Sequence, residues 1–307
     1  MSHPQLSIII PTHNRPDLLP VAVQSALNQT YQDLEVVVVD DASHPPAQLP
    51  EDPRLRIIRL DQGVGGAGAR NVGTQAARGR WVTYLDDDDC LLPHMAELSL
   101  SALSATDVTP PVGVISGIHK VNKHGEVLST RLPPAQRSKG SHFFLEPPEP
   151  GRSYLTKQTL VVERDLVLKI GGWDETFRSR VHSEFFLRLN PECTLIGIPT
   201  ITYHLFSHTG ARVSGNPALR QESFYRLIEK HRAAFESHPQ MFAEFIYQHA
   251  LTSYHMGQRQ AALSCYLWAL RLHPAHISRV TLRSACSSLS RGLKMRFSTG
   301  SKHSLSS

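Results

Sequence analysis

The chain has 307 residues, of which 40% are hydrophobic and 19% charged, and a formal net charge of +5. This length allows one large domain or two smaller ones with a full hydrophobic core, and the composition is that of an ordinary globular protein. No apolar stretch approaches the roughly 20 residues of a membrane-spanning helix, and the four cysteines have neither metal-ligand nor disulfide-framework spacing. The first residues lack a basic leader with an apolar core, so we expect no secretory signal and a cytoplasmic protein.

The chain opens with the pattern of a βαβ unit. Leu6–Ile10 is an unbroken apolar run, which predicts a strand buried on both faces. Asp17 can cap a helix over about Leu18–Asn28, and Leu34–Val39 is the next buried strand. The two strands should be parallel, with a right-handed crossover between them.

Two further strands are predicted at Leu55–Leu60 and Trp81–Leu85, with a helix over Arg70–Ala77 between them. Polar residues follow each of these strands. Because the carboxyl ends of parallel strands meet at one edge of a sheet, the polar residues should gather there. The sequence therefore predicts an α/β fold with a mostly parallel, Rossmann-like sheet flanked by helices.

The glycine-rich loop before that helix formally matches G-x-G-x-x-G through Gly63, Gly65 and Gly68. A nicotinamide-dependent enzyme is therefore an alternative to consider. Two features disfavour it: Asp61 and Gln62 separate the strand from the first glycine, and the next strand ends in four acids that would repel a pyrophosphate.

These four acids are the consecutive aspartates Asp86–Asp89, which follow the fourth strand. Hard divalent cations such as Mg²⁺ bind carboxylate oxygens and often share substrate phosphates. Open α/β sheets bind ligands at this carboxyl edge. A solvated acidic turn is the alternative.

The middle of the chain predicts a hairpin over about Val112–Leu132, with its turn at Lys123–Glu126, and a strand at Gln158–Glu163. A short helix should follow at Asp165–Ile170. Another helix, at Glu184–Leu189, should be capped by the preceding serine.

From about Gln221 the pattern is helical, and Ala243–His276 fits one tetratricopeptide-like unit with Gly257 at its turn. One repeat cannot form a solenoid, so a helical hairpin packed on the larger domain is favoured. Val280–Phe297 can form a basic amphipathic helix, of the kind that lies on a membrane or packs on a partner. If it contacts a membrane, we expect a peripheral position at the inner face.

Several pieces of the sequence, in this order and spacing, resemble glycosyltransferase family 2. The pieces are SIIIPTHNR, SALNQTYQDLEVVVVDDAS, GARNVG, RGRWVTYLDDDD, and GGWDETF followed by SEFFLRL. The resemblance spans about Leu6 to Ser214 and implies the GT-A fold. We therefore expect a GT-A domain over residues 1–215, a small helical, tetratricopeptide-like extension over 216–277, and a basic amphipathic helix with a disordered tail over 278–307.

The resemblance also implies a nucleotide-diphosphate-sugar donor, with UDP favoured, and a divalent metal, Mn²⁺ or Mg²⁺. It places Asp88 as the direct metal ligand, with Asp86 or Asp87 holding the ribose or metal-bound waters. The metal would neutralise the leaving diphosphate. In some related enzymes a histidine in this region completes the metal shell, and His208 is the corresponding candidate ligand here. The other donor-site residues that the resemblance implies are Pro11, Thr12, His13 and Arg15 after the first strand, Asp41 against the base, and Arg70 on the donor.

This chain departs from the family pattern at the catalytic base. The family has a Glu-Asp pair where this chain has Val181 and His182, so His182 takes the position of the base. The usual pKa of histidine, ~6.5, leaves it largely neutral at pH 7, and a position just before a helix N-terminus would keep it so. Glu184 is the competing base, or a partner of the helix dipole.

The expected activity is transfer of a sugar to an acceptor hydroxyl on a glycan, polysaccharide or lipid-linked acceptor, with inversion at the anomeric carbon. No nucleic-acid partner is expected. Two alternatives stay open. One is a GT-A protein that has lost catalysis and acts as a binding module. The other is a nucleotidyltransferase, although PTHNR is a poor version of the basic glycine-rich loop that such enzymes carry after the first strand.

Overall fold

The computed structural model describes residues 3–207 and 216–283. Contacts divide the chain into two compact units, residues 1–231 and 232–307. The helix that follows residue 215 belongs to the first of them. His208 and most of the predicted amphipathic helix Val280–Phe297, with the tail after it, lie outside the described residues.

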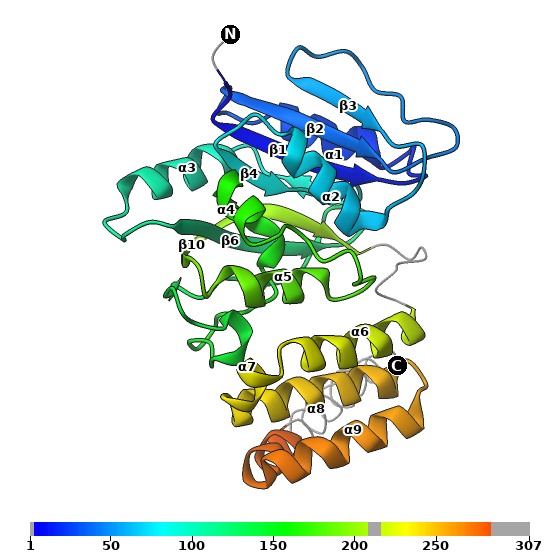
Figure 1. The fold of residues 1–307 in the computed structure, drawn as a ribbon, viewed down its shortest axis with the longest axis vertical. Helices are drawn as coiled ribbons and strands as arrows, with labels where there is room; N and C mark the ends of the chain where they lie inside the picture. Colours follow the sequence, from blue (N-terminus) through cyan, green and yellow to red (C-terminus); the bar gives the residue numbers. More distant parts are fainter. Residues whose placement is uncertain (1–2, 208–215, 284–307) are drawn as a thin grey trace, which may run out of the picture. The chain divides into compact units, whose positions relative to one another are not determined.

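The described part of the first unit is built on one mixed sheet in the order β3-β2-β1-β4-β9-β6-β10-β5, with β7 paired to β6 and β8 to β10 (Figure 1). The neighbours β3, β2, β1 and β4 are parallel, which confirms the predicted βαβ units, whereas β9 runs antiparallel to both of its neighbours. The strands are β1 (Leu6–Thr12), β2 (Leu34–Asp40), β3 (Leu55–Arg59), β4 (Trp81–Tyr84), β5 (Cys90–Leu91), β6 (Val112–Val121), β7 (Val127–Arg131), β8 (Gln136–Arg137), β9 (Val161–Glu163) and β10 (Thr194–Phe206).

Helices cover both faces of the parallel part of this sheet. On one face, β1 packs Leu6, Ile8 and Ile10 into a core shared with α1 (Leu19–Leu27) and α3 (Met95–Ala105). On the other face, Ile9 meets α2 (Gly65–Ala76). A Cβ on Gly73 of α2 would lie 2.4 Å from Cγ2 of Ile9, so only glycine allows this close approach. Burial on both faces explains why these strands are continuous apolar runs.

Several helices and strands begin or end at other residues than the sequence predicted. No side chain caps α1, whose N-cap is Leu18 and not Asp17. Only three residues of the predicted strand 158–163 pair, because residues 157–159 form a 3-10 turn. The predicted 112–132 hairpin is confirmed by β6 and β7.

The helix predicted from Glu184 is α5 (Val181–Leu189), and it begins three residues earlier. Its N-cap is Arg180, with φ of +61°, and no side-chain cap forms. His182 therefore lies inside the first turn of α5 instead of before it. The remaining helical segments of the first unit are η1 (Phe143–Leu145), η2 (Lys157–Thr159), α4 (Arg164–Lys169) and α6 (Pro217–Lys230).

The second unit contains α7 (Arg232–Glu236) and the antiparallel pair α8 (Pro239–His255) and α9 (Arg259–Leu272). Gly257 lies at the turn between α8 and α9, as predicted, with φ of +79° that favours glycine. The tetratricopeptide-like identity of this hairpin stays a prediction. Among the described residues, none of the helices combines the length and hydrophobicity needed to cross a bilayer.

Candidate active site

The carboxyl ends of β1 and β4 bring the predicted donor loop against the acidic run. Thr12, at the end of β1, donates its hydroxyl to Oδ2 of Asp87 at 2.7 Å. Burial, aided by the neighbouring carboxylates of Asp88 and Asp86, raises the pKa of Asp87 to about 6, while Thr12 and Arg15 act in the opposite direction. The loop that follows Pro11 and the acidic run therefore form one polar surface, as the sequence predicted.

Asp41, at the end of β2, holds the glycine-rich loop. Its two carboxylate oxygens accept the backbone N–H groups of Val64 and Gly65 at 2.6 and 2.8 Å. The Nδ1–H of His13 donates to the carbonyl of Asp41 at 2.6 Å. A dinucleotide fold would bind pyrophosphate with the N–H groups at this helix N-terminus. Here the chain's own carboxylate occupies them, which argues against the nicotinamide alternative.

Three of the four consecutive aspartates converge. One carboxylate oxygen from each of Asp86, Asp88 and Asp89 lies within 4.8 Å of the others. This all-oxygen set is of the type that binds Mg²⁺ or Mn²⁺, so the residues fit the metal that the sequence predicted. His208, the other predicted ligand, lies outside the described residues.

Asp89 was not predicted as part of the site, and it fixes the acidic run to β10. Its side chain is buried, and it accepts hydrogen bonds from the hydroxyl of Tyr203 and the N–H of Phe206, both at 2.8 Å. Burial, with the charges of Asp86 and Asp88, raises the pKa of Asp89 well above its usual value. Asp89 therefore anchors the loop that presents the other aspartates.

Arg70 of α2 pairs with Asp86. Its Nη2 donates to Oδ1 of Asp86, and its Nη1 donates to the carbonyl of Gly66 at 2.8 Å. The guanidinium carbon also lies 5.3 Å from the ring centre of Trp173. Arg70 is buried, so this is a positioned charge and not a surface salt bridge.

His182 joins this group through the same tryptophan ring. The rings of His182 and Trp173 meet edge to face at 5.1 Å, and Trp173 stacks on Phe185 of α5 at 4.2 Å. Burial and the charge of Arg70 lower the pKa of His182 to about 3, although Asp86 acts in the opposite direction. The lowered pKa favours the expected neutral imidazole, but burial and a nearby cation are the cause, whereas the prediction invoked a helix N-terminus.

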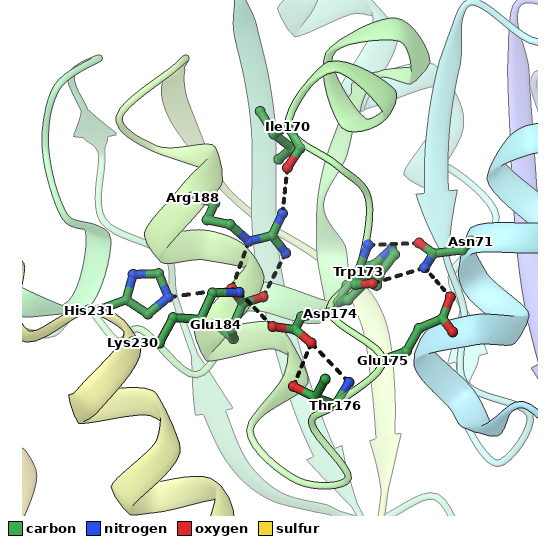
Figure 2. Close-up of polar contacts among 10 residues, drawn as sticks. All are labelled: Asn71, Ile170, Trp173, Asp174, Glu175, Thr176, Glu184, Arg188, Lys230 and His231. Carbon is green, nitrogen blue, oxygen red and sulfur yellow. Dashed lines mark hydrogen bonds and ion pairs between the residues drawn. The ribbon is translucent and has the colours of Figure 1, made fainter.

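Glu184 is hydrogen-bonded to cationic side chains of α5 and α6 (Figure 2). Its buried carboxylate accepts two hydrogen bonds from Arg188, at 2.7 and 2.6 Å, and one from Lys230 at 2.7 Å. Although burial alone would raise it, hydrogen bonds from Arg188, His231 and Lys230 hold the pKa of Glu184 far below its usual value. Both carboxylate oxygens already accept hydrogen bonds, so the geometry favours a role for Glu184 in joining α5 to α6 over the expected role as a competing base.

Asn71 and Trp173 were quoted in the sequence motifs, but their roles were missed. Asn71 accepts from the N–H of Trp173 at 2.7 Å, and donates to its carbonyl at 2.9 Å and to Glu175 at 2.8 Å (Figure 2). The sequence signal for Asn71 is the motif GARNVG, which also contains Arg70. Lys230 had no signal of this kind, because it lies 46 positions from Glu184.

A helix-flanked mixed sheet, with an acidic run at the carboxyl edge of its parallel part, is the architecture of the GT-A class. The crystal structure of S. aureus TarS 1-349 in complex with UDP-GlcNAc has this fold, with a TM-score of 0.62 and 15% identity over 89% of this chain and 82% of that one. Residues 7–152 match the family described as Glycosyl transferase family 2. Residues 7–152 therefore belong to glycosyltransferase family 2.

Two relatives with curated descriptions are similar to parts of the chain. An uncharacterized glycosyltransferase of Haemophilus influenzae is 28% identical over 200 residues, 61% of this chain and 62% of that protein. The GalNAc(5)-diNAcBac-PP-undecaprenol beta-1,3-glucosyltransferase of Campylobacter jejuni is 40% identical over 96 residues, 29% of this chain and 31% of that protein. The chain thus aligns with less than two thirds of either relative.

Proposed function

We propose that this protein transfers a sugar from a UDP-sugar to an acceptor hydroxyl. The observation that carries the proposal is the connected group Asp86, Arg70, Trp173 and His182, which joins an acidic metal-type cluster to a neutral base. The UDP-GlcNAc in the TarS structure favours uridine as the nucleotide. The name of the Campylobacter relative favours a lipid-linked diphosphate sugar as the acceptor.

Asp88 and Asp86 would hold the divalent cation. A bound Mg²⁺ or Mn²⁺ neutralises charge on the diphosphate, which makes it a better leaving group. Arg70 keeps Asp86 in place through its ion pair and adds a cation on the donor side. Asp89 holds the run of aspartates in place through its hydrogen bonds to β10.

His182 would act as the general base. Its imidazole is neutral, so it can take the proton of the acceptor hydroxyl as the oxygen attacks the anomeric carbon. The bond to UDP breaks on the opposite side, with inversion of configuration. The Trp173 ring, which is itself stacked on Phe185, restricts the position of the imidazole, and this supports the role.

Thermal unfolding with UDP, GDP, CDP or dTDP, each with and without Mn²⁺, tests the donor site. A nucleotide at a hundred times its dissociation constant stabilises the folded state by about 2.7 kcal/mol. We expect this shift with UDP, dependent on Mn²⁺ and absent in Asp88→Asn. The absence of a shift with every nucleotide would overturn the proposal and favour the binding-module alternative. Release of pyrophosphate from a nucleoside triphosphate and a sugar phosphate would favour the nucleotidyltransferase.

A further inference from the structure

We propose that Arg131, Lys157 and Arg180 form an anion subsite beside His182, and that it binds the phosphate or diphosphate group of the acceptor. This proposal rests on the proposed function, because it assigns the substrate class that the same active site accepts. The three residues, named here the cationic subsite, come from the end of β7, from η2 and from the N-cap of α5.

Lys157 is the centre of the cationic subsite. Its Nζ lies 5.3 Å from the ring centre of Phe144 and 5.9 Å from that of Phe143, so two aromatic rings flank the ammonium group. Cation–π contacts favour the charged form of the group, in opposition to the apolar surroundings. Arg180, two positions before His182 in the chain, ties the cationic subsite to the first turn of α5.

Two members of the cationic subsite, Lys157 and Arg131, carry positive charge that no carboxylate of the described residues neutralises. Across residues 3–207 and 216–283, neither Lys157 nor Arg131 forms an ion pair with a carboxylate, and Arg131 donates to the carbonyl of Leu155 at 3.5 Å. The sequence of 208–215, HTGARVSG, contains no acidic residue that could supply one. Gathering cations in this way costs free energy, which a bound anion would offset.

The electrostatics of the three cations agree with this picture. Burial and the charges of Arg180 and Arg131 lower the pKa of Lys157 to about 7, so its proton is easily lost in the free protein. Burial, with the charge of Arg220, lowers the pKa of Arg180 to about 9. A phosphate would restore full protonation, because lysine supplies a point charge and arginine a two-pronged donor that matches phosphate oxygens.

The cationic subsite lies on the acceptor side of the base. The charges that act on Asp87 come from Asp88, Asp86 and Arg15, which belong to the donor loop and acidic run. His182, in contrast, lies on α5, which packs against η2 and therefore against the segment that carries Lys157, and the charges of both Asp86 and Lys157 act on it. The imidazole is thus flanked by an acidic region, which suits a metal-bound donor diphosphate, and by a cationic region. An anion in the cationic region would belong to the molecule that His182 deprotonates.

Calorimetric titration with inorganic pyrophosphate tests the cationic subsite, with Mn²⁺ and saturating UDP present to fill the donor site. We expect wild-type protein to bind pyrophosphate under these conditions, and Lys157→Met to bind it at least ten-fold more weakly. Lys123→Met removes the same charge from the exposed β6–β7 turn and should bind like the wild type. Arg131→Gln is a second variant in case Lys157→Met does not fold, and it should also weaken binding.

Two results would overturn the proposal. One is pyrophosphate binding that disappears when UDP is bound, which assigns the anion to the donor site. The other is unchanged binding in folded Lys157→Met and Arg131→Gln. Titration of the wild type and the same variants with UDP separates the two proposals. If the wild-type protein binds pyrophosphate but not UDP, only the proposed function is contradicted. If it binds UDP normally but does not bind pyrophosphate, only the cationic subsite is contradicted.

Discussion

The side-chain amide of Asn71 is hydrogen-bonded to both the N–H and the carbonyl of Trp173, a residue 102 positions later in the chain. The neighbouring Arg70 lies over the ring of the same tryptophan. One turn of α2 therefore positions Asp86, through Arg70, and the ring that contacts His182, through Asn71. A change at Asn71 should thus affect catalysis without touching either substrate.

Asn71→Ala should reduce the transfer rate more than it reduces UDP affinity. The substitution leaves a backbone N–H and a carbonyl of Trp173 without their partner, so we also expect a loss of about 1–3 kcal/mol in the free energy of unfolding. Denaturant unfolding, UDP titration and initial rates measure the three quantities. Asn28→Ala, at the exposed C-cap of α1, is the control and should change stability by less than about 0.5 kcal/mol.

His182→Gln should lower kcat by about 10²–10⁴ with unchanged UDP affinity, because it removes the base and keeps the donor site. The pKa of His182, at about 3, also predicts the pH profile. The imidazole stays unprotonated between pH 8 and 5, so kcat at saturating substrates should not fall with an apparent pKa near 6.5. A profile that does fall there would assign the base to a different group.

The same histidine should make the folded protein sensitive to acid. Below pH 6.5 the unfolded chain protonates this imidazole, whereas the folded protein does so only near pH 3. The free energy of unfolding therefore decreases as the pH falls from about 6.5 towards 3. Between pH 7.5 and 5.0, we expect wild-type protein to lose about 2 kcal/mol more than His182→Gln, measured by urea unfolding. Equal losses would contradict a half-buried imidazole that is neutral in the folded protein.

Glu184→Gln should act on stability and not on proton transfer. It leaves Arg188 and Lys230 without their shared buried carboxylate, which costs about 3–5 kcal/mol. The matched control is Glu222→Gln, because Glu222 and Arg226 form an exposed pair with the same i,i+4 spacing and contribute about 0.5 kcal/mol or less. Where Glu184→Gln remains folded, its kcat should be close to that of the wild type. A complete loss of kcat in folded protein would instead identify Glu184 as the base.

The central strands β1 and β2 and their polar carboxyl edge could be predicted from the sequence, because burial on both faces produces continuous apolar runs that end at polar residues. The start of α5 could not, because Ser183 is a strong local cap signal and the left-handed Arg180 that displaces it has none. The role of Glu184 was also hidden. A glutamate in a first helical turn looks like a helix-dipole partner, and its cations become visible only when α6 packs beside α5.

The short strand β9 has a consequence for how this chain acquires its structure during synthesis. Val161 pairs with Thr83 of β4 and also with Val114 of β6, so one residue closes the sheet between its two parts. When the ribosome has released only the segment that matches the family, residues 7–152, the strands β4 and β6 have no strand between them. The nascent protein must keep two open strand edges apart from other chains until residues 161–163 emerge. The aspartates and His182 can come together in one site only after that step.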